Sequence, residues 1–111
     1  MQASNGYTTA AMIKAGNDGG TIQLGSTYGI IAIMHYLAKY CKRRNIRVNC
    51  ISPGGILDNQ PESFLKKYRS SCTSKGMLDP EDLVGALLYL LSDQSRYVNG
   101  HNIIVDDGWS L

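Results

Sequence analysis

Residues 46–56 read "IRVNCISPGGI", and this stretch decides the fold. Residues 46–51 are rich in β-branched and apolar side chains, a composition typical of a strand covered on both faces of a sheet. The Ser-Pro-Gly-Gly segment that follows interrupts the strand, because proline lacks an amide proton and glycine favours turns. The stretch therefore predicts a short buried strand that ends in a loop.

Segments on both sides of this strand alternate between helical and extended patterns. Apolar residues recur at helical spacing from Ile30 onward, which predicts a helix over residues 30–44. Pro61 suits the first position of a helix, and Asp79 followed by Pro80 is a typical helix start. The sequence also predicts a short helix over residues 7–15, a strand over 21–24, helices over 61–72 and 79–93, and a final strand over about 102–106.

Strands separated by helices imply parallel pairing through right-handed crossovers. We therefore expect an α/β fold with three parallel strands and flanking helices. No internal repeat or linker divides the chain, so residues 1–111 are predicted to form a single unit.

Composition excludes several classes of protein. With 43% hydrophobic and 18% charged residues, the chain has the composition of an ordinary globular protein, and its net charge of +2 does not by itself favour a polyanionic partner. We interpret the local basic cluster as a solvated helix end rather than a nucleic-acid interface. This cluster comprises Lys39, Lys42, Arg43, Arg44 and Arg47.

The sequence predicts neither a metal site nor a membrane span. The three cysteines lack CxxC spacing and suggest reduced thiols, and His35 and His101 have no metal-ligand spacing. No signal-peptide pattern follows Met1. The longest apolar run, residues 83–91, falls short of the ~20 residues of a membrane helix, so we expect a cytoplasmic chain.

Three stretches, in this order, resemble the second half of a short-chain dehydrogenase/reductase. They are "GGTIQLGSTYG", "YLAKYCKRRNIRVNCISPGGI" and the pair "DPEDLVGALLYLLSD" with "YVNGHNIIVDDGW". The resemblance covers nearly the whole chain and implies a partial domain with a partial Rossmann-type sheet. It also implies NAD or NADP as cofactor, with hydride transfer to or from a carbonyl or alcohol carbon. The residues of these stretches further resemble the branch of the family associated with nine-carbon sugar biosynthesis and flagellin glycosylation.

The resemblance assigns roles to four residues. Ser26 matches the catalytic serine that polarises the substrate carbonyl. Pro53, Gly54 and Ile56 match the loop that passes near the nicotinamide, with the Ile56 backbone at the position that contacts the carboxamide. Where many relatives have a threonine, this chain has Asp58, whose negative charge would oppose a cofactor phosphate.

Two motifs of the family are absent from the sequence. It contains no glycine-rich phosphate loop, which in the family belongs to a unit preceding this region. It also contains no Tyr-x-x-x-Lys pair: Tyr36 and Lys39 are three residues apart, and Tyr40 is followed four residues later by Arg44. In the family the tyrosine precedes the Pro-Gly by roughly thirty residues, which corresponds here to the neighbourhood of Gln23.

Two hypotheses remain open at this point. The chain is either an NAD(P)-dependent oxidoreductase by descent, or a non-catalytic fragment that acts in oligomerisation or interaction. For the second, the 30–44 helix is predicted to form a homo-oligomer interface through an apolar stripe. The stripe comprises Ile30, Ile33, Met34, Leu37 and Cys41, and Trp109 is predicted to be a packing anchor.

Overall fold

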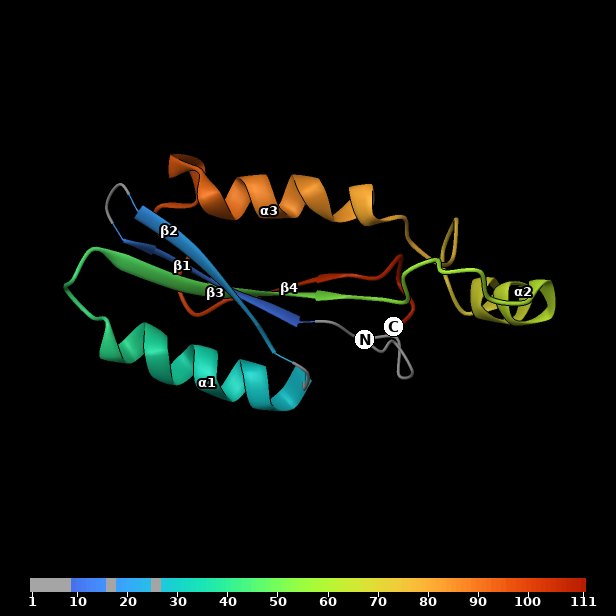
Figure 1. The fold of residues 1–111 in the computed structure, drawn as a ribbon, viewed down its shortest axis with the longest axis horizontal. Helices are drawn as coiled ribbons and strands as arrows, with labels where there is room; N and C mark the ends of the chain where they lie inside the picture. Colours follow the sequence, from blue (N-terminus) through green and yellow to red (C-terminus); the bar gives the residue numbers. More distant parts are fainter. Residues whose placement is uncertain (1–8, 16–17, 25–26) are drawn as a thin grey trace.

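The computed structural model describes residues 9–15, 18–24 and 27–111 (Figure 1). The described strands are β1 (Thr9–Ala15), β2 (Asp18–Leu24), β3 (Ile46–Pro53) and β4 (Asn102–Val105). The described helices are α1 (Thr27–Tyr40), α2 (Glu62–Ser70) and α3 (Val84–Leu91), with short 3-10 turns η2 (Pro80–Leu83) and η3 (Asp93–Ser95).

The four strands form one sheet in the order β2-β1-β3-β4. Only β3 and β4 pair in parallel, because β1 is antiparallel to both of its neighbours. The prediction of three parallel strands is therefore wrong in part: the α/β class and the parallel β3–β4 pair are confirmed. The predicted strand at 21–24 lies in β2, which is separated from β3 by β1.

The predicted helix over residues 7–15 is wrong in its described part, which forms β1. Its alanines, methionine and lysine have good helix propensity, but that preference is worth well under ~1 kcal/mol per residue. Pairing along both edges, from Ala15 opposite Asp18 and from Ala10 opposite Ile51, overrides it. Only two residues separate β1 from β2 in the sequence, a length typical of a hairpin.

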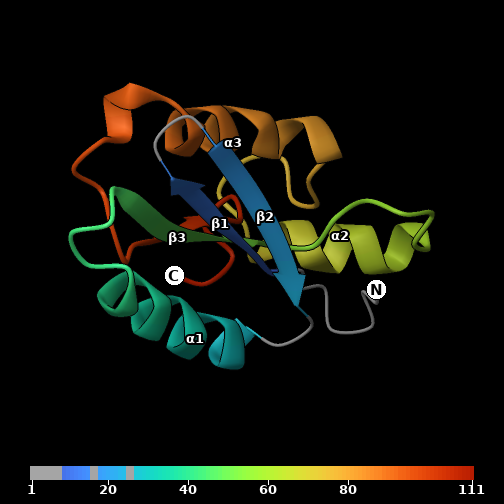
Figure 2. The same cartoon turned by 60° about the vertical axis from the view of Figure 1, so that its left-hand side comes forward.

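Helices α1 and α3 cover opposite faces of the sheet (Figures 1 and 2). On the α1 face, Ile30 and Met34 are fully buried against Val48 and Cys50. On the α3 face, Ile51 packs with Leu90. Strand β3 is therefore buried on both sides, as its sequence predicts, and it continues to Pro53.

The predicted oligomer stripe on α1 requires correction. Ile30 and Met34 belong to the chain's own core, so they are not available to a partner. The outer face of α1 instead exposes Ile33, Tyr36 and Tyr40, and the two tyrosine rings stack with centroids 6.0 Å apart. The helix also ends earlier than predicted, at Tyr40.

Arg47 does not belong to the solvated helix end to which the sequence assigns it. It lies on β3, and its guanidinium donates hydrogen bonds to the carbonyl oxygens of Ser95 at 2.8 Å and Leu90 at 3.0 Å. These carbonyls lie at the end of α3 and in η3, where a helix carries partial negative charge. Arg47 therefore fastens α3 to the central strand, while Arg43 and Arg44 remain exposed in the turn after α1.

The start of the last helical segment follows its sequence signals. Asp79 is the N-cap of η2, Pro80 takes the first position, and the Asp79 amide donates to the Asp82 carboxylate at 2.9 Å. Within the described residues, no helix has the length and hydropathy needed to span a membrane.

Candidate functional site

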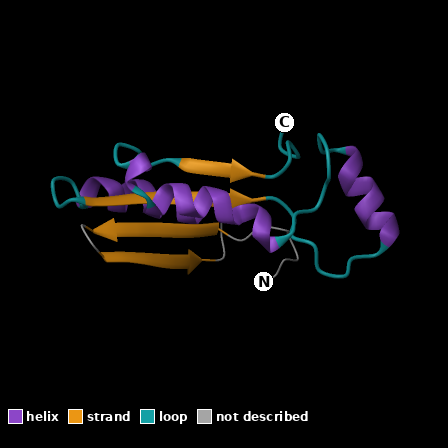
Figure 3. Ribbon diagram, turned by 90° about the horizontal axis from the view of Figure 1, so that it is seen from above, coloured by secondary structure: helices purple, strands orange, loops and turns teal. Residues whose placement is uncertain are grey.

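Strands β3 and β4 run in parallel and end at the same edge of the sheet, at Pro53 and Val105. In α/β sheets, ligands bind outside the carboxyl ends of parallel strands. The loop after β3 and the segment after β4 meet there, and α2 lies beyond them (Figure 3). This edge is therefore the candidate site.

The two glycines of the loop are buried and closely packed. The Gly54 amide donates to the Val105 carbonyl at 2.8 Å, which continues the parallel ladder beyond Pro53. A Cβ atom on Gly54 would lie 2.8 Å from the Asp106 Cβ, and one on Gly55 would lie 2.7 Å from the Met77 sulfur. The two glycines thus let Asp106, directly after β4, and Met77 approach the loop backbone.

Ile56 follows these glycines and forms a parallel bridge with Leu78. The bridge uses the Leu57 amide, which donates to the Leu78 carbonyl at 2.7 Å, and the Gly55 carbonyl, which accepts from the Leu78 amide at 2.8 Å. Because backbone groups alternate along an extended chain, the amide of Ile56 points away from Leu78. It has no acceptor among the described residues. Among the described residues, the loop therefore has one amide donor at the strand end without an acceptor.

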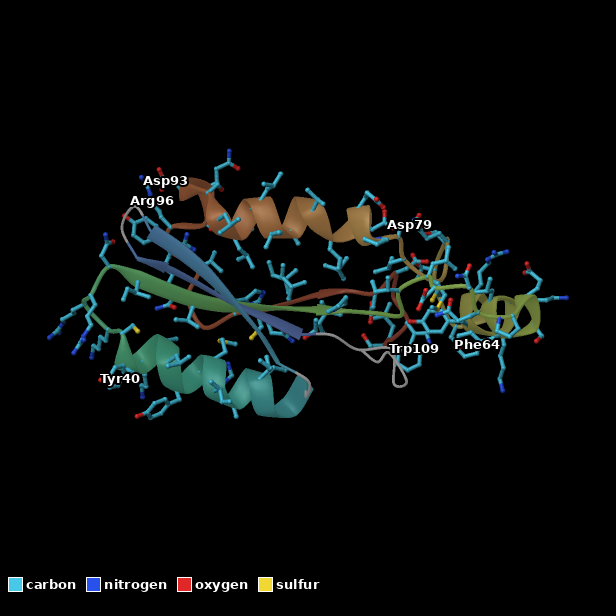
Figure 4. The ribbon with its side chains drawn as sticks, viewed as in Figure 1. Tyr40, Phe64, Asp79, Asp93, Arg96 and Trp109 are labelled. Carbon is cyan, nitrogen blue, oxygen red and sulfur yellow. The ribbon has the colours of Figure 1, made fainter. Side chains whose placement is uncertain are left out.

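Aromatic side chains from α2 and the C-terminal segment gather beside this loop (Figure 4). The Tyr68 hydroxyl accepts a hydrogen bond from the Gly55 amide at 2.7 Å. The Tyr68 ring stacks on Trp109 with centroids 5.7 Å apart and an interplanar angle of 10°, and the centroid of the Phe64 ring lies 6.1 Å from that of Tyr68. Trp109 therefore packs as predicted, against α2.

Asp107 anchors the chain that returns from α2. Its φ of 53° places it in the left-handed region, and its carboxylate accepts hydrogen bonds from the amides of Ser74, Lys75 and Gly76 at 3.1, 2.6 and 2.7 Å. Hydrogen bonds from the Gly76 amide and then the Ser74 hydroxyl hold the pKa of the Asp107 carboxyl well below its usual range. The loop after α2 is thus fixed to the segment after β4.

Tyr68 and Asp107 are parts of the site that sequence reasoning missed. Tyr68 follows Phe64 by four residues in the predicted 61–72 helix, a spacing that places both rings on one helix face. Asp107 precedes Gly108 in an Asp-Asp-Gly sequence, which is typical of a turn. Each signal indicates a local structure, but neither identifies the distant backbone groups that these side chains bind.

The other predicted site residues differ in their positions: some lie at this edge of the sheet, and one falls outside the described residues. Pro53, Gly54 and Ile56 lie together at the strand end, as the resemblance implies. Asp58 is exposed, and its amide donates to the Gln60 side chain at 2.7 Å. Ser26 lies outside the described residues, directly before the start of α1 in the sequence.

In the described part of the chain, neither the cysteine thiols nor a group of metal-ligating side chains points to a nucleophilic or metal site. Burial raises the pKa of the Cys50 thiol to about 11, and desolvation, followed by the charges of Asp107 and Asp106, raises the pKa of Cys72. Raised pKa values disfavour the thiolate, which is the nucleophilic form. The described residues contain no group of three potential metal-ligating side chains.

Comparison with known proteins identifies the family. Residues 7–110 match the family model described as Enoyl-(Acyl carrier protein) reductase. The chain is 52% identical over 96 residues to post-translational flagellin modification protein A of Campylobacter coli, covering 82% of this chain and 38% of that protein. It is 31% identical over 97 residues to 7alpha-hydroxysteroid dehydrogenase of Bacteroides fragilis, again covering 38% of the relative.

Solved structures agree with these matches. A short-chain dehydrogenase from Leptospira borgpetersenii, crystallised with bound NAD+, superposes with a TM-score of 0.73 at 44% identity, covering 76% of this chain and 33% of that one. A 4-hydroxyisoleucine dehydrogenase in complex with NADH gives a TM-score of 0.70 at 30% identity, covering 75% of this chain and 37% of that one. The chain thus spans little more than a third of its relatives. The sequence resemblance is confirmed: the chain belongs to the short-chain dehydrogenase/reductase family.

Proposed function

We propose that this chain supplies the nicotinamide-facing side of an NAD(P) site for oxidoreduction of a carbonyl or alcohol substrate. The observation that carries the proposal is the Ile56 amide, which points away from Leu78 and is held at the carboxyl end of β3 and β4. A carboxamide oxygen is a suitable acceptor for such a donor. Binding of NAD+ and NADH by two structural relatives supports a nicotinamide ligand.

The chain's own residues suit the nicotinamide end of the cofactor better than its phosphates. Gly54 and Gly55 fix the loop by packing against the protein, and the Ile56 amide is left to donate to the carboxamide. The nicotinamide ring, when bound, supplies the hydride donor or acceptor. Asp58, exposed two residues beyond Ile56, disfavours a phosphate nearby. We therefore expect weak binding that depends on the nicotinamide.

We further propose that this chain alone does not catalyse turnover. The family's proton transfer depends on a Tyr-x-x-x-Lys pair between the serine and the Pro-Gly loop, and residues 26–53 contain none. A positioned acid or base contributes about 10²–10⁴-fold to rate. Arg44, four residues after Tyr40, does not replace the lysine, because a guanidinium keeps its proton and has a different shape.

The test combines calorimetric titration with NADH and NADPH and an assay of NADH oxidation with a panel of aldehydes and ketones. We expect a Kd on the order of 1 mM and no rate above the protein-free control. Asp58→Asn is the matched variant, and it is expected to bind NADPH several-fold more tightly by removing a repulsive charge. Micromolar binding with turnover would overturn the proposed inactivity, and absence of binding at ~10 mM would overturn the cofactor site.

A second candidate function is self-association through the outer face of α1. The exposed Ile33, Tyr36 and Tyr40 form an apolar and aromatic surface along one side of this helix. Such a surface suits a symmetric contact between two copies. We expect light scattering at micromolar concentration to report a dimer or larger species, and Ile33→Glu to shift it toward the monomer. A single monomeric species of the unmodified chain would exclude this function.

A further inference from the structure

Tyr68 occupies an unusual position between the loop after β3 and the C-terminal segment. Its hydroxyl accepts from the Gly55 amide at 2.7 Å, while its ring stacks on Trp109 at 5.7 Å. It belongs to α2, which lies outside the sheet (Figure 3). One side chain therefore connects α2, the loop and the segment after β4.

The Gly55 amide depends on this hydroxyl. Gly55 is buried, and a buried amide without an acceptor is costly. Its carbonyl oxygen accepts from the Leu78 amide at 2.8 Å, so both polar groups of the residue are held by specific partners. The Gly55 carbonyl and the Ile56 amide belong to one planar peptide unit, so the bond from Leu78 sets the direction of the Ile56 amide. The bond to Tyr68 holds the preceding peptide unit and thereby keeps Gly55 from rotating out of this arrangement.

The Tyr68 ring is itself held in place. Trp109 stacks nearly parallel to it, and the 73–76 loop that follows α2 is bound to Asp107. A ring restrained in this way presents its hydroxyl to Gly55 with little loss of side-chain entropy on binding. Trp109, in the C-terminal segment, thus restrains the loop after β3 by holding the Tyr68 side chain of α2.

We propose that Tyr68 is a positioning residue: held by Trp109, it fixes the Gly55 peptide and thereby aims the Ile56 amide at the nicotinamide carboxamide. This inference rests on the proposed cofactor site for its ligand. Its first consequence, restraint of the loop by the Tyr68 hydroxyl, is independent of any cofactor. Tyr68 does not touch the reacting atoms and acts only through the backbone.

The first experiment measures amide hydrogen exchange by NMR in the full chain without ligand. Tyr68→Phe removes the hydroxyl but keeps the stacking ring, and exchange at Gly55 is expected to accelerate about tenfold or more. The Gly100 amide, which donates to the Val48 carbonyl at the other end of the sheet, should not change. Tyr97→Phe, at a highly exposed tyrosine, is the matched control. Unchanged Gly55 exchange in Tyr68→Phe would overturn the proposal.

Variants of Trp109 separate positioning from general stabilisation. Trp109→Phe retains an aromatic stacking partner and is expected to keep Gly55 exchange within about twofold of the original chain. Trp109→Leu removes the stack and is expected to accelerate exchange at Gly55 more than at Gly100. Equal acceleration at both amides would mean that Trp109 only stabilises the fold, and this would overturn its role in holding Tyr68.

The second experiment titrates NADH while following the Ile56 amide resonance. Tyr68→Phe is expected to weaken binding about three- to tenfold, whereas Tyr97→Phe is expected to leave the Kd unchanged. Equal affinity of Tyr68→Phe and the original chain would overturn the link to the cofactor. If NADH does not move the Ile56 resonance of the original chain, the proposed function fails. The exchange experiment still decides whether Tyr68 restrains the loop.

Discussion

Replacing Arg47 with alanine should destabilise the protein far more than the same change at a neighbouring arginine. Arg47 lies on β3, and its guanidinium reaches the backbone near the end of α3 and at the last residue of η3. The alanine variant removes the charged donor from both carbonyl oxygens, which among the described residues keep only the Val98 amide (to Ser95) and the Ser95 hydroxyl (to Leu90) as donors. It also removes a positive charge from a helix C-terminus.

The expected magnitude follows from the hydrogen bonds. Three are short: to the Ser95 carbonyl at 2.8 Å, to the Ser95 hydroxyl at 3.0 Å and to the Leu90 carbonyl at 3.0 Å. Hydrogen bonds to charged groups contribute about 1.5–3 kcal/mol each. Because one partly exposed group makes all three, we expect a total of about 2–4 kcal/mol rather than their sum.

Urea unfolding followed by far-UV circular dichroism measures the effect. With a slope of about 2 kcal/mol per molar urea, the midpoint of Arg47→Ala should fall by roughly 1–2 M. Arg44→Ala is the matched control, since Arg44 is exposed and contacts the Tyr40 ring at 5.4 Å, an interaction worth about 0.5–1 kcal/mol. Arg47→Lys keeps the charge but loses the planar fork and should fall between the two. Equal midpoints for Arg47→Ala and Arg44→Ala would refute this account of β3 and α3.

Three further predictions concern the site and the core. Gly54→Ala should lower the free energy of unfolding by about 1–3 kcal/mol, because the added Cβ would lie 2.8 Å from the Asp106 Cβ. Gly85→Ala, where a Cβ would have nothing within 4 Å, should instead stabilise α3 by about 0.5–1 kcal/mol. Thermal unfolding measures both, and the opposite order of stabilities would contradict the packing. Iodoacetamide at pH 8 should modify the buried Cys50 last of the three thiols, because burial raises its pKa to about 11; early modification, detected by mass spectrometry, would contradict its burial. Because hydrogen bonds lower the pKa of Asp107, its contribution to stability should be complete above the ordinary aspartate pKa and should decline as pH falls below ~4. Asp107→Asn should flatten this dependence of the unfolding free energy on acid pH. An unchanged pH dependence in the variant would refute the role given to the Asp107 carboxylate.

The sequence predicts the elements whose signals are local. β3 has a covered-strand composition followed by Pro-Gly, and the predicted helix over 61–72 is present as α2, although Pro61 is its N-cap rather than its first residue. The end of the chain likewise contains the expected strand β4. The error at β1 has a physical cause: its residues favour a helix locally, but pairing with β2 and β3 decides their conformation. The same non-local pairing removes the predicted third parallel strand.

The candidate site likewise contains residues that the sequence identifies and residues whose role only the structure shows. The family resemblance assigns Pro53, Gly54 and Ile56 to the cofactor loop, and the Pro-Gly pattern at the end of β3 shows only where a strand stops. Tyr68 acts on an amide 13 residues away, and Arg47 binds carbonyls more than 40 residues away, so their roles depend on how the elements pack. A sequence pattern shows that such a residue is polar or aromatic but does not show its partner.

The proposed function requires the loop after β3 to present the Ile56 amide to a nicotinamide carboxamide. It is tested most directly by titrating the ¹⁵N-labelled chain with reduced nicotinamide mononucleotide, which lacks the adenosine half of the cofactor. We expect a saturable shift of the Ile56 amide resonance, an unchanged Gly100 resonance, and a clearly smaller Ile56 shift with an analogue that lacks the carboxamide. An Ile56 resonance that does not move, or that moves equally with both compounds, would contradict it.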